Sequence, residues 1–279
     1  MTAPTNCPPY PLDNDHAHAY AHHRYLSAML DPITRDRVTG AVQATRPTGL
    51  TGSRCLEVGA GGGSIARWLA GEVGPFGFVT ALDLKPHHIP HQQRITVVAH
   101  DLNGDEPLPG GPFDLIHARL VLAHLPKRRD ILRDLVDRLT LNGVIVIGDW
   151  RTTNPDPVIA APNAADADLY RRFQQILGTQ VFAAAGTDRD WAAHAHTAMR
   201  EEGLTDVFTT VDAEFWEGGG TGCQLIATVI EEVRPRLLAA GLTDDELEQL
   251  TALVNDPRLV LHGHPLYYTS GRRTPSYKG

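Results

Sequence analysis

Three features are scarce in this chain of 279 residues, and each scarcity excludes a class of protein. The three cysteines, Cys7, Cys55 and Cys223, are odd in number and irregularly spaced, so they indicate neither a disulfide framework nor a cysteine zinc site. No apolar run reaches the length of about 18 residues that a transmembrane helix needs, and no signal-peptide core is visible. We therefore expect a cytoplasmic protein that makes no contact with a membrane.

Basic residues are also in deficit. The chain has 25 Lys and Arg against 33 Asp and Glu, a formal net charge of −8, and no basic cluster. Neutralising phosphates requires a basic face, so a nucleic-acid partner is not expected. The hydrophobic content of 42% is that of an ordinary globular protein, and the length suffices for a full core. A small-molecule partner is therefore favoured, and a homodimer is a possible assembly.

Glycine, by contrast, is concentrated in one stretch. Residues 55–58 are apolar apart from Glu57, four of the next five residues are glycine, and residues 65–70 have helical character. A strand, a tight turn and a helix in this order direct free backbone N–H groups and the positive end of the helix dipole at a ligand. This arrangement is typical of a nucleotide site. The dinucleotide fingerprint G-x-G-x-x-G/A is incomplete, because Ser64 occupies its last position.

A different pattern matches in full. Glu57, Gly59, Gly61 and Gly63 form Glu-x-Gly-x-Gly-x-Gly, which resembles motif I of the class I S-adenosylmethionine (SAM) methyltransferases. The resemblance continues through four further segments that look like the second to fifth strands of that family, and it is strongest over residues 53–150. Within that family, the sequence is similar to the ubiquinone/menaquinone-type branch and its natural-product relatives. The four segments are residues 79–83, 95–102, 113–119 and 143–149.

The hydrophobic pattern predicts an α/β fold with a doubly wound sheet. Residues 144–147 are apolar without alternation, which is typical of a parallel strand that is buried on both faces. The resemblance implies a seven-stranded, mostly parallel Rossmann-like sheet, with a sixth strand over residues 205–216 and a seventh over 259–268. About 40 residues separate these two strands, far more than a hairpin loop needs, so we expect a lid there.

Helices are predicted from apolar spacing and from capping residues. We expect one helix over residues 15–30, ended by Asp31-Pro32, and a second over 35–44. Further helices are expected over 129–139, after Asp190 as N-cap, over 225–239 with a break near Pro235, and after Thr243, which begins a capping box. The whole chain is interpreted as one methyltransferase domain. Its parts are an N-terminal arm and cap helices (1–50), a SAM-binding core (51–150), a lid insertion (151–204) and C-terminal strands with a helical insertion (205–279).

The resemblance implies which residues bind the cofactor. Asp83 would hold the ribose hydroxyls, Asp101 the adenine, and Glu57 would lie near the methionyl end of SAM. Each acid also has a purely structural alternative, as a cap or as the partner of its own turn. Lys85 departs from the family, because many relatives carry a second acid there. The predicted cofactor residues are Glu57, Gly59, Ala60, Gly61, Gly63, Asp83, Leu84, Asp101, Leu102 and Arg119.

Three residues are predicted to be catalytic. His124, after the fourth strand, and Asp149, at the end of the fifth, resemble a His and an Asp that small-molecule O-methyltransferases carry near the methyl group. We expect His124 to act as general base and Asp149 to orient its ring and raise its pKa. His117 is a second candidate. The alternative is that His124 only packs beside the cofactor, since alignment and exclusion of water can supply most of the acceleration.

No metal is expected. His-x-His pairs occur at residues 16/18, 194/196 and 262/264, but no carboxylate or cysteine accompanies them. The predicted function is SAM-dependent O-methylation of a hydroxyl on a small, partly apolar molecule such as a secondary metabolite, with S-adenosylhomocysteine (SAH) as product. The alternative is a protein with the SAM fold that transfers no methyl group and uses the cofactor structurally or binds a small ligand.

Overall fold

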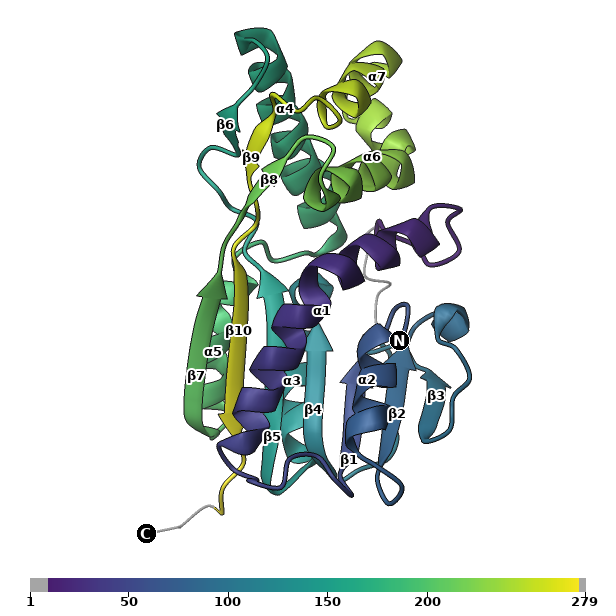
Figure 1. The fold of residues 1–279 in the computed structure, drawn as a ribbon, viewed down its shortest axis with the longest axis vertical. Coiled ribbons are helices and arrows are strands. Elements are labelled where there is room, and N and C mark those ends of the chain that lie inside the picture. The colour runs from purple at the N-terminus through teal and green to yellow at the C-terminus, as the bar shows by residue number, and fades with distance from the viewer. Residues whose placement is uncertain (1–9, 276–279) are drawn as a thin grey trace.

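The computed structural model describes residues 10–275, and its main element is a seven-stranded sheet with the strand order β3-β2-β1-β4-β5-β10-β7 (Figure 1). Strands β1 to β5 are parallel to one another, and β10 runs antiparallel to both β5 and β7. The predicted doubly wound, mostly parallel sheet is therefore confirmed. Cys7 and the first nine residues of the expected arm lie outside the described residues. The strands are β1 Arg54–Val58, β2 Phe78–Asp83, β3 Ile95–Ala99, β4 Phe113–Arg119, β5 Leu139–Trp150, β7 Thr205–Asp212 and β10 Leu266–Arg272.

Helices cover both faces of this sheet. Successive residues of a strand point to opposite faces, and in β1 Cys55 packs under helices α1 (Ala19–Gln43) and α2 (Ser64–Glu72). Leu56 packs on the other face, against α3 (Arg128–Asp137) and α5 (Trp191–Glu201). The unbroken apolar runs of the central strands are explained by this double cover.

Helix α1 is a single helix of 25 residues and not the two helices that Asp31-Pro32 led us to expect. Pro32 lies inside it and removes one N–H donor. The helix continues because Leu30, Val38 and Val42 are buried against the sheet. The Thr34 hydroxyl also donates to the Leu30 carbonyl at 2.7 Å. Burial along one face therefore outweighs the local cost of the proline.

A second layer lies beyond the carboxyl ends of the parallel strands (Figure 1). We call it the cap, defined as residues 158–185 and 215–262. It holds a three-stranded antiparallel sheet in the order β6-β9-β8 and has its own apolar core. Its elements are β6 Val158–Ala160, α4 Ala164–Ile176, the π-helical turn η3 Leu177–Phe182, η4 Ala183–Ala185, β8 Phe215–Glu217, α6 Thr221–Ala239, α7 Asp244–Leu253 and β9 Val260–His262.

The outer two predicted strands differ from expectation, because each is divided between the two layers. Residues 205–216 form β7 in the main sheet and then enter β8 in the cap, while residues 259–268 form β9 and then β10. Pro265 lies between β9 and β10, and a proline cannot donate to a strand ladder, so pairing is interrupted there.

The predictions for the helices other than α1 are confirmed only in part. Thr243 and Glu246 form the predicted capping box at the start of α7. Helix α6 is continuous through Pro235. Asp190 is the N-cap of α5 but caps no N–H with its side chain, which instead accepts hydrogen bonds from Arg151 and Thr153. Helix α5, the last part of the predicted lid, packs against the main sheet. No helix within residues 10–275 has the length and apolar character to cross a bilayer.

Candidate active site

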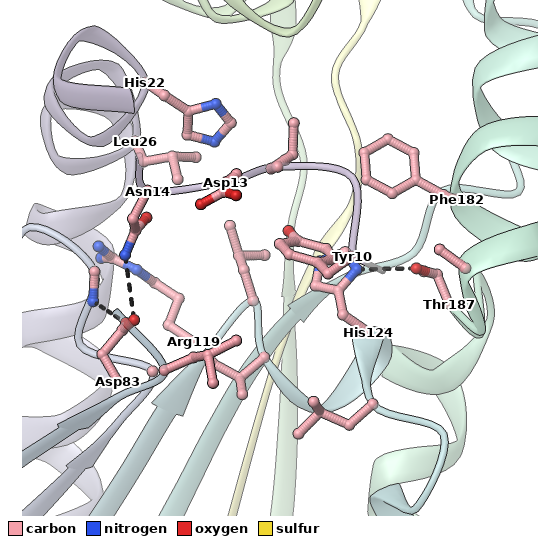
Figure 2. A pocket seen from close by; sticks show the side chains of 18 of the residues that line it. Tyr10, Asp13, Asn14, His22, Leu26, Asp83, Arg119, His124, Phe182 and Thr187 are labelled. Carbon is pink, nitrogen blue, oxygen red and sulfur yellow. Dashed lines mark hydrogen bonds between the residues drawn. The ribbon is translucent and has the colours of Figure 1, made fainter. Parts of the chain in front are cut away.

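A large cavity lies between the carboxyl ends of the parallel strands, helix α1 and the cap (Figure 2). Its volume is about 1210 Å³. In open α/β sheets this edge is where ligands bind. Every predicted cofactor residue except Gly63 lines the cavity, namely Glu57, Gly59, Ala60, Gly61, Asp83, Leu84, Asp101, Leu102 and Arg119.

The glycine turn forms the floor of this cavity. Gly59 has a φ of 63° and Gly61 a φ of 53°, in the left-handed region that favours glycine. A Cβ atom on Gly59 would lie 2.3 Å from Cγ2 of Val121, so a side chain there would collide with the loop after β4. Gly63 lies outside the cavity lining and is the N-cap of α2, with a φ of 72°, and its role in cofactor binding stays a prediction.

Asp83 joins this turn to the loop after β2. Its Oδ2 accepts a hydrogen bond from the Gly61 N–H at 2.8 Å, and its Oδ1 accepts one from the Lys85 N–H at 2.9 Å. Each carboxylate oxygen has two lone pairs, so the group retains acceptor capacity toward a ribose diol. A carboxylate at the rim and a floor that excludes side chains fit the predicted adenosyl cofactor.

Glu57 is held from behind by His117. The His117 Nδ1 lies 2.7 Å from Oε2 of Glu57, and both residues are buried. His117 is fully buried and does not line the cavity. The prediction that His117 acts on the substrate is therefore not supported by its position, since the ring lies beneath the site and fixes the Glu57 carboxylate.

Arg119 points toward helix α1 rather than across the cavity floor. Its guanidinium donates to Asp31 at 3.0 Å and to the Thr34 hydroxyl at 2.7 Å. The contact fixes the middle of α1 over the end of β4. Arg119 therefore lines the cavity and also attaches its roof to its floor, while its predicted role in cofactor binding stays a prediction.

The structure does not join His124 and Asp149. The His124 Nδ1 lies 3.1 Å from the hydroxyl of Thr187 (Figure 2), and neither Asp149 oxygen has a hydrogen-bond partner among the described residues. Burial, and secondarily the charge of Arg128, lowers the pKa of His124 to about 4, opposite to the predicted rise. Burial also raises the pKa of Asp149 to about 7, although the nearby N–H groups of Ala123 and Val121 oppose the shift. The predicted orienting contact is therefore wrong.

The reason for this error is geometric. Residues at the ends of neighbouring strands lie close in the backbone, but their side chains need not point at each other. Asp149 is 1% exposed and lies outside the large cavity, whereas His124 lines it from the turn η2 (Leu122–His124). Whether His124 acts as a base stays a prediction.

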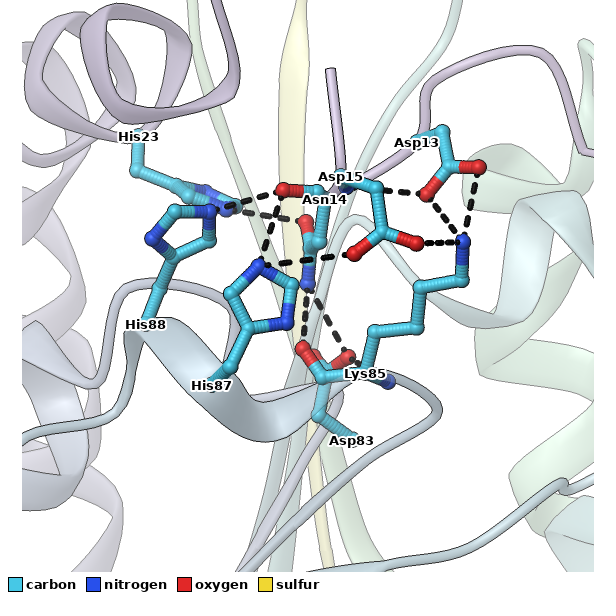
Figure 3. Close-up of polar contacts among 8 residues, drawn as sticks. All are labelled: Asp13, Asn14, Asp15, His23, Asp83, Lys85, His87 and His88. Atoms are coloured by element: carbon cyan, nitrogen blue, oxygen red, sulfur yellow. Dashed lines mark hydrogen bonds and ion pairs between the residues drawn. The ribbon is translucent and has the colours of Figure 1, made fainter. Parts of the chain in front are cut away.

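An N-terminal segment crosses the cofactor rim, and its contacts there were not predicted (Figure 3). The Asn14 amide donates to Asp83 at 3.2 Å and to the Lys85 carbonyl at 3.0 Å. Lys85, the departure from the family pattern, donates to Asp13 at 2.5 and 2.8 Å and to Asp15 at 2.5 Å. We call residues 10–18 the strap. The opposite charges of Lys85 and of the two strap aspartates were the sequence signal that could have predicted this contact.

The other half of the cavity is an apolar chamber beneath the cap. Its wall combines aromatic and aliphatic side chains with a few polar groups. Two of these, His22 of α1 and Glu232 of α6, were missed from the sequence. Both occur at helical spacing from apolar lining residues, which was a detectable signal. The apolar members are Leu12, Leu26, Trp150, Leu177, Phe182, Trp216, Leu225, Ile226 and Val229.

Within residues 10–275 no group of three or more His, Cys, Asp or Glu residues is arranged to hold a metal ion. His262 lies beside Phe215, while His264 packs against Trp150 and Trp216. The predicted pair at 262/264 therefore does not converge.

Comparison with known proteins identifies the domain. A family model described as a methyltransferase domain matches residues 56–145. Methyltransferase str2 of Strobilurus tenacellus is 36% identical over 99 residues, which are 34% of this chain and 35% of that protein. The match thus spans about a third of the relative's length.

Two solved structures share the fold over most of the chain. The plantazolicin methyltransferase BpumL, determined with SAH, has a TM-score of 0.51 at 12% identity and covers 93% of this chain and 91% of its own. A cyclopropane-fatty-acyl-phospholipid synthase-like protein from Lactobacillus casei ATCC 334 has a TM-score of 0.50 at 16% identity, covering 92% and 94%. At these identities the likeness is one of fold. Residues 56–145 therefore match a methyltransferase domain, and the chain shares its fold with a methyltransferase solved with SAH, as the glycine motif led us to expect.

Proposed function

We propose that this protein transfers the methyl group of SAM to a hydroxyl on a small, partly apolar acceptor and releases SAH. The observation that carries the proposal is the continuity of one cavity from the glycine turn to the chamber beneath the cap. A site for one drug-sized ligand has a volume of about 300–1000 Å³. The volume here is about 1210 Å³, which leaves room for an acceptor beside the cofactor.

The chemistry of the chamber wall supports the class of acceptor. Trp150, Phe182 and Trp216 provide flat apolar surfaces that suit an aromatic or polycyclic molecule. Polar groups are few, which is typical of sites that orient a mostly apolar ligand through one or two hydrogen bonds. The formal net charge of −8 also disfavours a polyanionic acceptor.

The residues of this chain contribute alignment and shielding. SAM supplies an electrophilic methyl group on a sulfonium sulfur. Asp83 and Glu57 fix the two ends of the cofactor region, while the cap and α1 enclose the acceptor. Transfer in line between two bound molecules gains most of its acceleration from such positioning and from the exclusion of water.

Two measurements test the proposal. Calorimetry should show binding of SAM and SAH, with NAD as the control that does not bind. Incubation of the protein and SAM with naphthols, hydroxyflavones and aliphatic alcohols should produce SAH with at least one of them. SAM binding without SAH from any hydroxylated compound would favour the non-transferring alternative, and binding of NAD with no response to SAM would overturn the cofactor assignment.

A further inference from the structure

Helices α1 and α6 meet through a buried polar pair that faces the acceptor chamber. The Nδ1 of His22 lies 2.8 Å from Oε2 of Glu232, across 210 positions of sequence. The side chains are 11% and 2% exposed, and both residues line the cavity. Burying a carboxylate is costly unless it is paired, so this contact is a defined feature of the chamber wall.

The contact determines which nitrogen of the imidazole carries the proton. When Nδ1–H donates to the carboxylate, the neutral ring carries its lone pair on Nε2. Among residues 10–275 the His22 ring hydrogen-bonds through Nδ1, and it projects into the cavity (Figure 2). A lone pair facing the ligand, with a carboxylate behind the ring, is the arrangement that a general base requires.

The second histidine of the chamber is less suited to this task. The Nδ1 of His124 contacts the neutral hydroxyl of Thr187 at 3.1 Å. Its pKa is lowered to about 4, first by burial, then by Arg128 and by the charge of His22. An efficient base has a pKa near the working pH and a partner that stabilises its cation. Glu232 gives His22 such a partner.

Resting on the proposed function, we infer that His22 is the catalytic base of acceptor methylation and that Glu232 is its positioning residue. The acceptor oxygen forms a bond to the methyl carbon, and the carbon–sulfur bond breaks with its electron pair moving to sulfur. The hydroxyl proton passes to Nε2 of His22. The resulting imidazolium keeps its Nδ1–H bond to the Glu232 carboxylate.

Steady-state kinetics with the best hydroxylated probe of the panel gives the first test. His22→Gln should lower kcat about 10²- to 10⁴-fold, the range of general-base catalysis, with an unchanged KM for SAM. Glu232→Gln should lower kcat less, because the ring remains. His194→Gln, on the exposed side of α5, is the matched control and should behave as the parent. A kcat of His22→Gln within threefold of the parent overturns the proposal.

The pH profile separates a base from a residue that only packs. A general base gives kcat a low-pH limb, and His22→Gln should lose the limb that the parent shows. The titratable groups around His22 are Glu232 from α6, His23 on its own helix and His124 from η2, and Tyr10 of the strap lines the same cavity. A variant that retains the parent's low-pH limb assigns the titration to one of the others and overturns the proposal.

A double variant addresses the structural alternative, in which the pair only fastens α1 to α6. His22→Leu with Glu232→Met replaces the polar pair by apolar packing, which often preserves the stability of such a contact. The proposal expects a folded protein that binds SAM and has lost activity. Full activity in that variant would show that the pair is a fastening alone.

Nitrogen NMR of the SAH-bound protein, labelled with ¹⁵N-histidine, tests the pair without any acceptor. A neutral His22 with its proton on Nδ1 supports the proposal, and a proton on Nε2 overturns it. This readout holds even if no compound of the panel is methylated, an outcome that would count against the proposed function instead.

Discussion

The two halves of the cavity differ in how the chain builds them. The cofactor half is formed by loops that follow neighbouring parallel strands, around Glu57, Asp83 and Asp101, so local motifs fix its position. The chamber half joins side chains as distant in sequence as His22 and Glu232. A local motif can therefore identify the cofactor half. The chamber half forms only when segments that are far apart in the sequence pack together.

The largest expected effect lies in the support of the cofactor half. Glu57→Leu removes the carboxylate that pairs with His117 and leaves the buried imidazole without a partner at either nitrogen. We expect the free energy of unfolding to fall by about 3–5 kcal/mol, measured by urea denaturation. Glu232→Leu is the counterpart in the chamber and should cost less, because His22 reaches the cavity and its water. Equal losses in both variants would remove the distinction between the halves.

A pH-dependent effect is expected at Asp149, below the chamber. Burial raises its pKa from 3.8 to about 7 in the folded protein, so the folded state holds this proton more tightly than the unfolded state. The stability gained by holding this proton is complete at pH values below 4 and is lost as the pH rises through 7. Asp149→Asn should therefore gain stability over the parent by about 3 kcal/mol more at pH 8 than at pH 5. Denaturation curves at the two pH values measure this, and a gain equal at both would contradict it.

The independence of the halves predicts a selective loss of cofactor affinity. Asp83→Ala should weaken SAM binding by about 1.5–3 kcal/mol, or 10- to 150-fold, because hydrogen bonds to a charged group are lost. Val229→Ala, in the chamber, should leave SAM affinity unchanged. Isothermal calorimetry of both variants is the measurement. A comparable loss in Val229→Ala would show that the cap contributes to cofactor binding.

The smallest effect concerns the strap. Asn14→Ala removes hydrogen bonds to Asp83 and to the Lys85 carbonyl, each of which stabilises by about 0.5–1.5 kcal/mol. We expect SAM to dissociate about 2- to 10-fold faster by stopped-flow measurement, which is the effect of a net loss of one such bond from the bound state alone. Amide hydrogen exchange in residues 13–18 should also become faster. Unchanged exchange would show that Asn14 does not hold the strap in place.

The sheet could be predicted from the sequence because its signals are local. Unbroken apolar runs marked the central strands, and an acid at the end of β2 marked the cofactor rim. The errors arose where tertiary contacts compete with local signals. Pro32 does not end α1, since burial of Leu30 and Val38 holds the helix together. Pro265 does interrupt a strand, whereas the apolar pattern around it predicted one continuous strand.

The site, like the sheet, was predictable where its residues are positioned by local sequence signals. The acids and glycines of the cofactor half line the cavity because strand ends determine where they lie. The pairing of His124 with Asp149 failed, because side-chain direction depends on the loops and helices that pack around a strand end. No sequence spacing relates His22 to Glu232, so their contact could be found only from the folded chain.

The passage of the outer strands from one sheet into the other has a consequence for protein engineering. The chain leaves the main sheet for the cap after β5 and after β7, and it returns before α5 and before β10. These four junctions are short, and the junction between β9 and β10 already tolerates a proline. A foreign cap grafted at the same points would inherit the cofactor floor intact. New acceptor specificities can thus be sought by exchanging residues 158–185 and 215–262 as one unit, with matching changes at Leu12, at Trp150 and in the first half of α1.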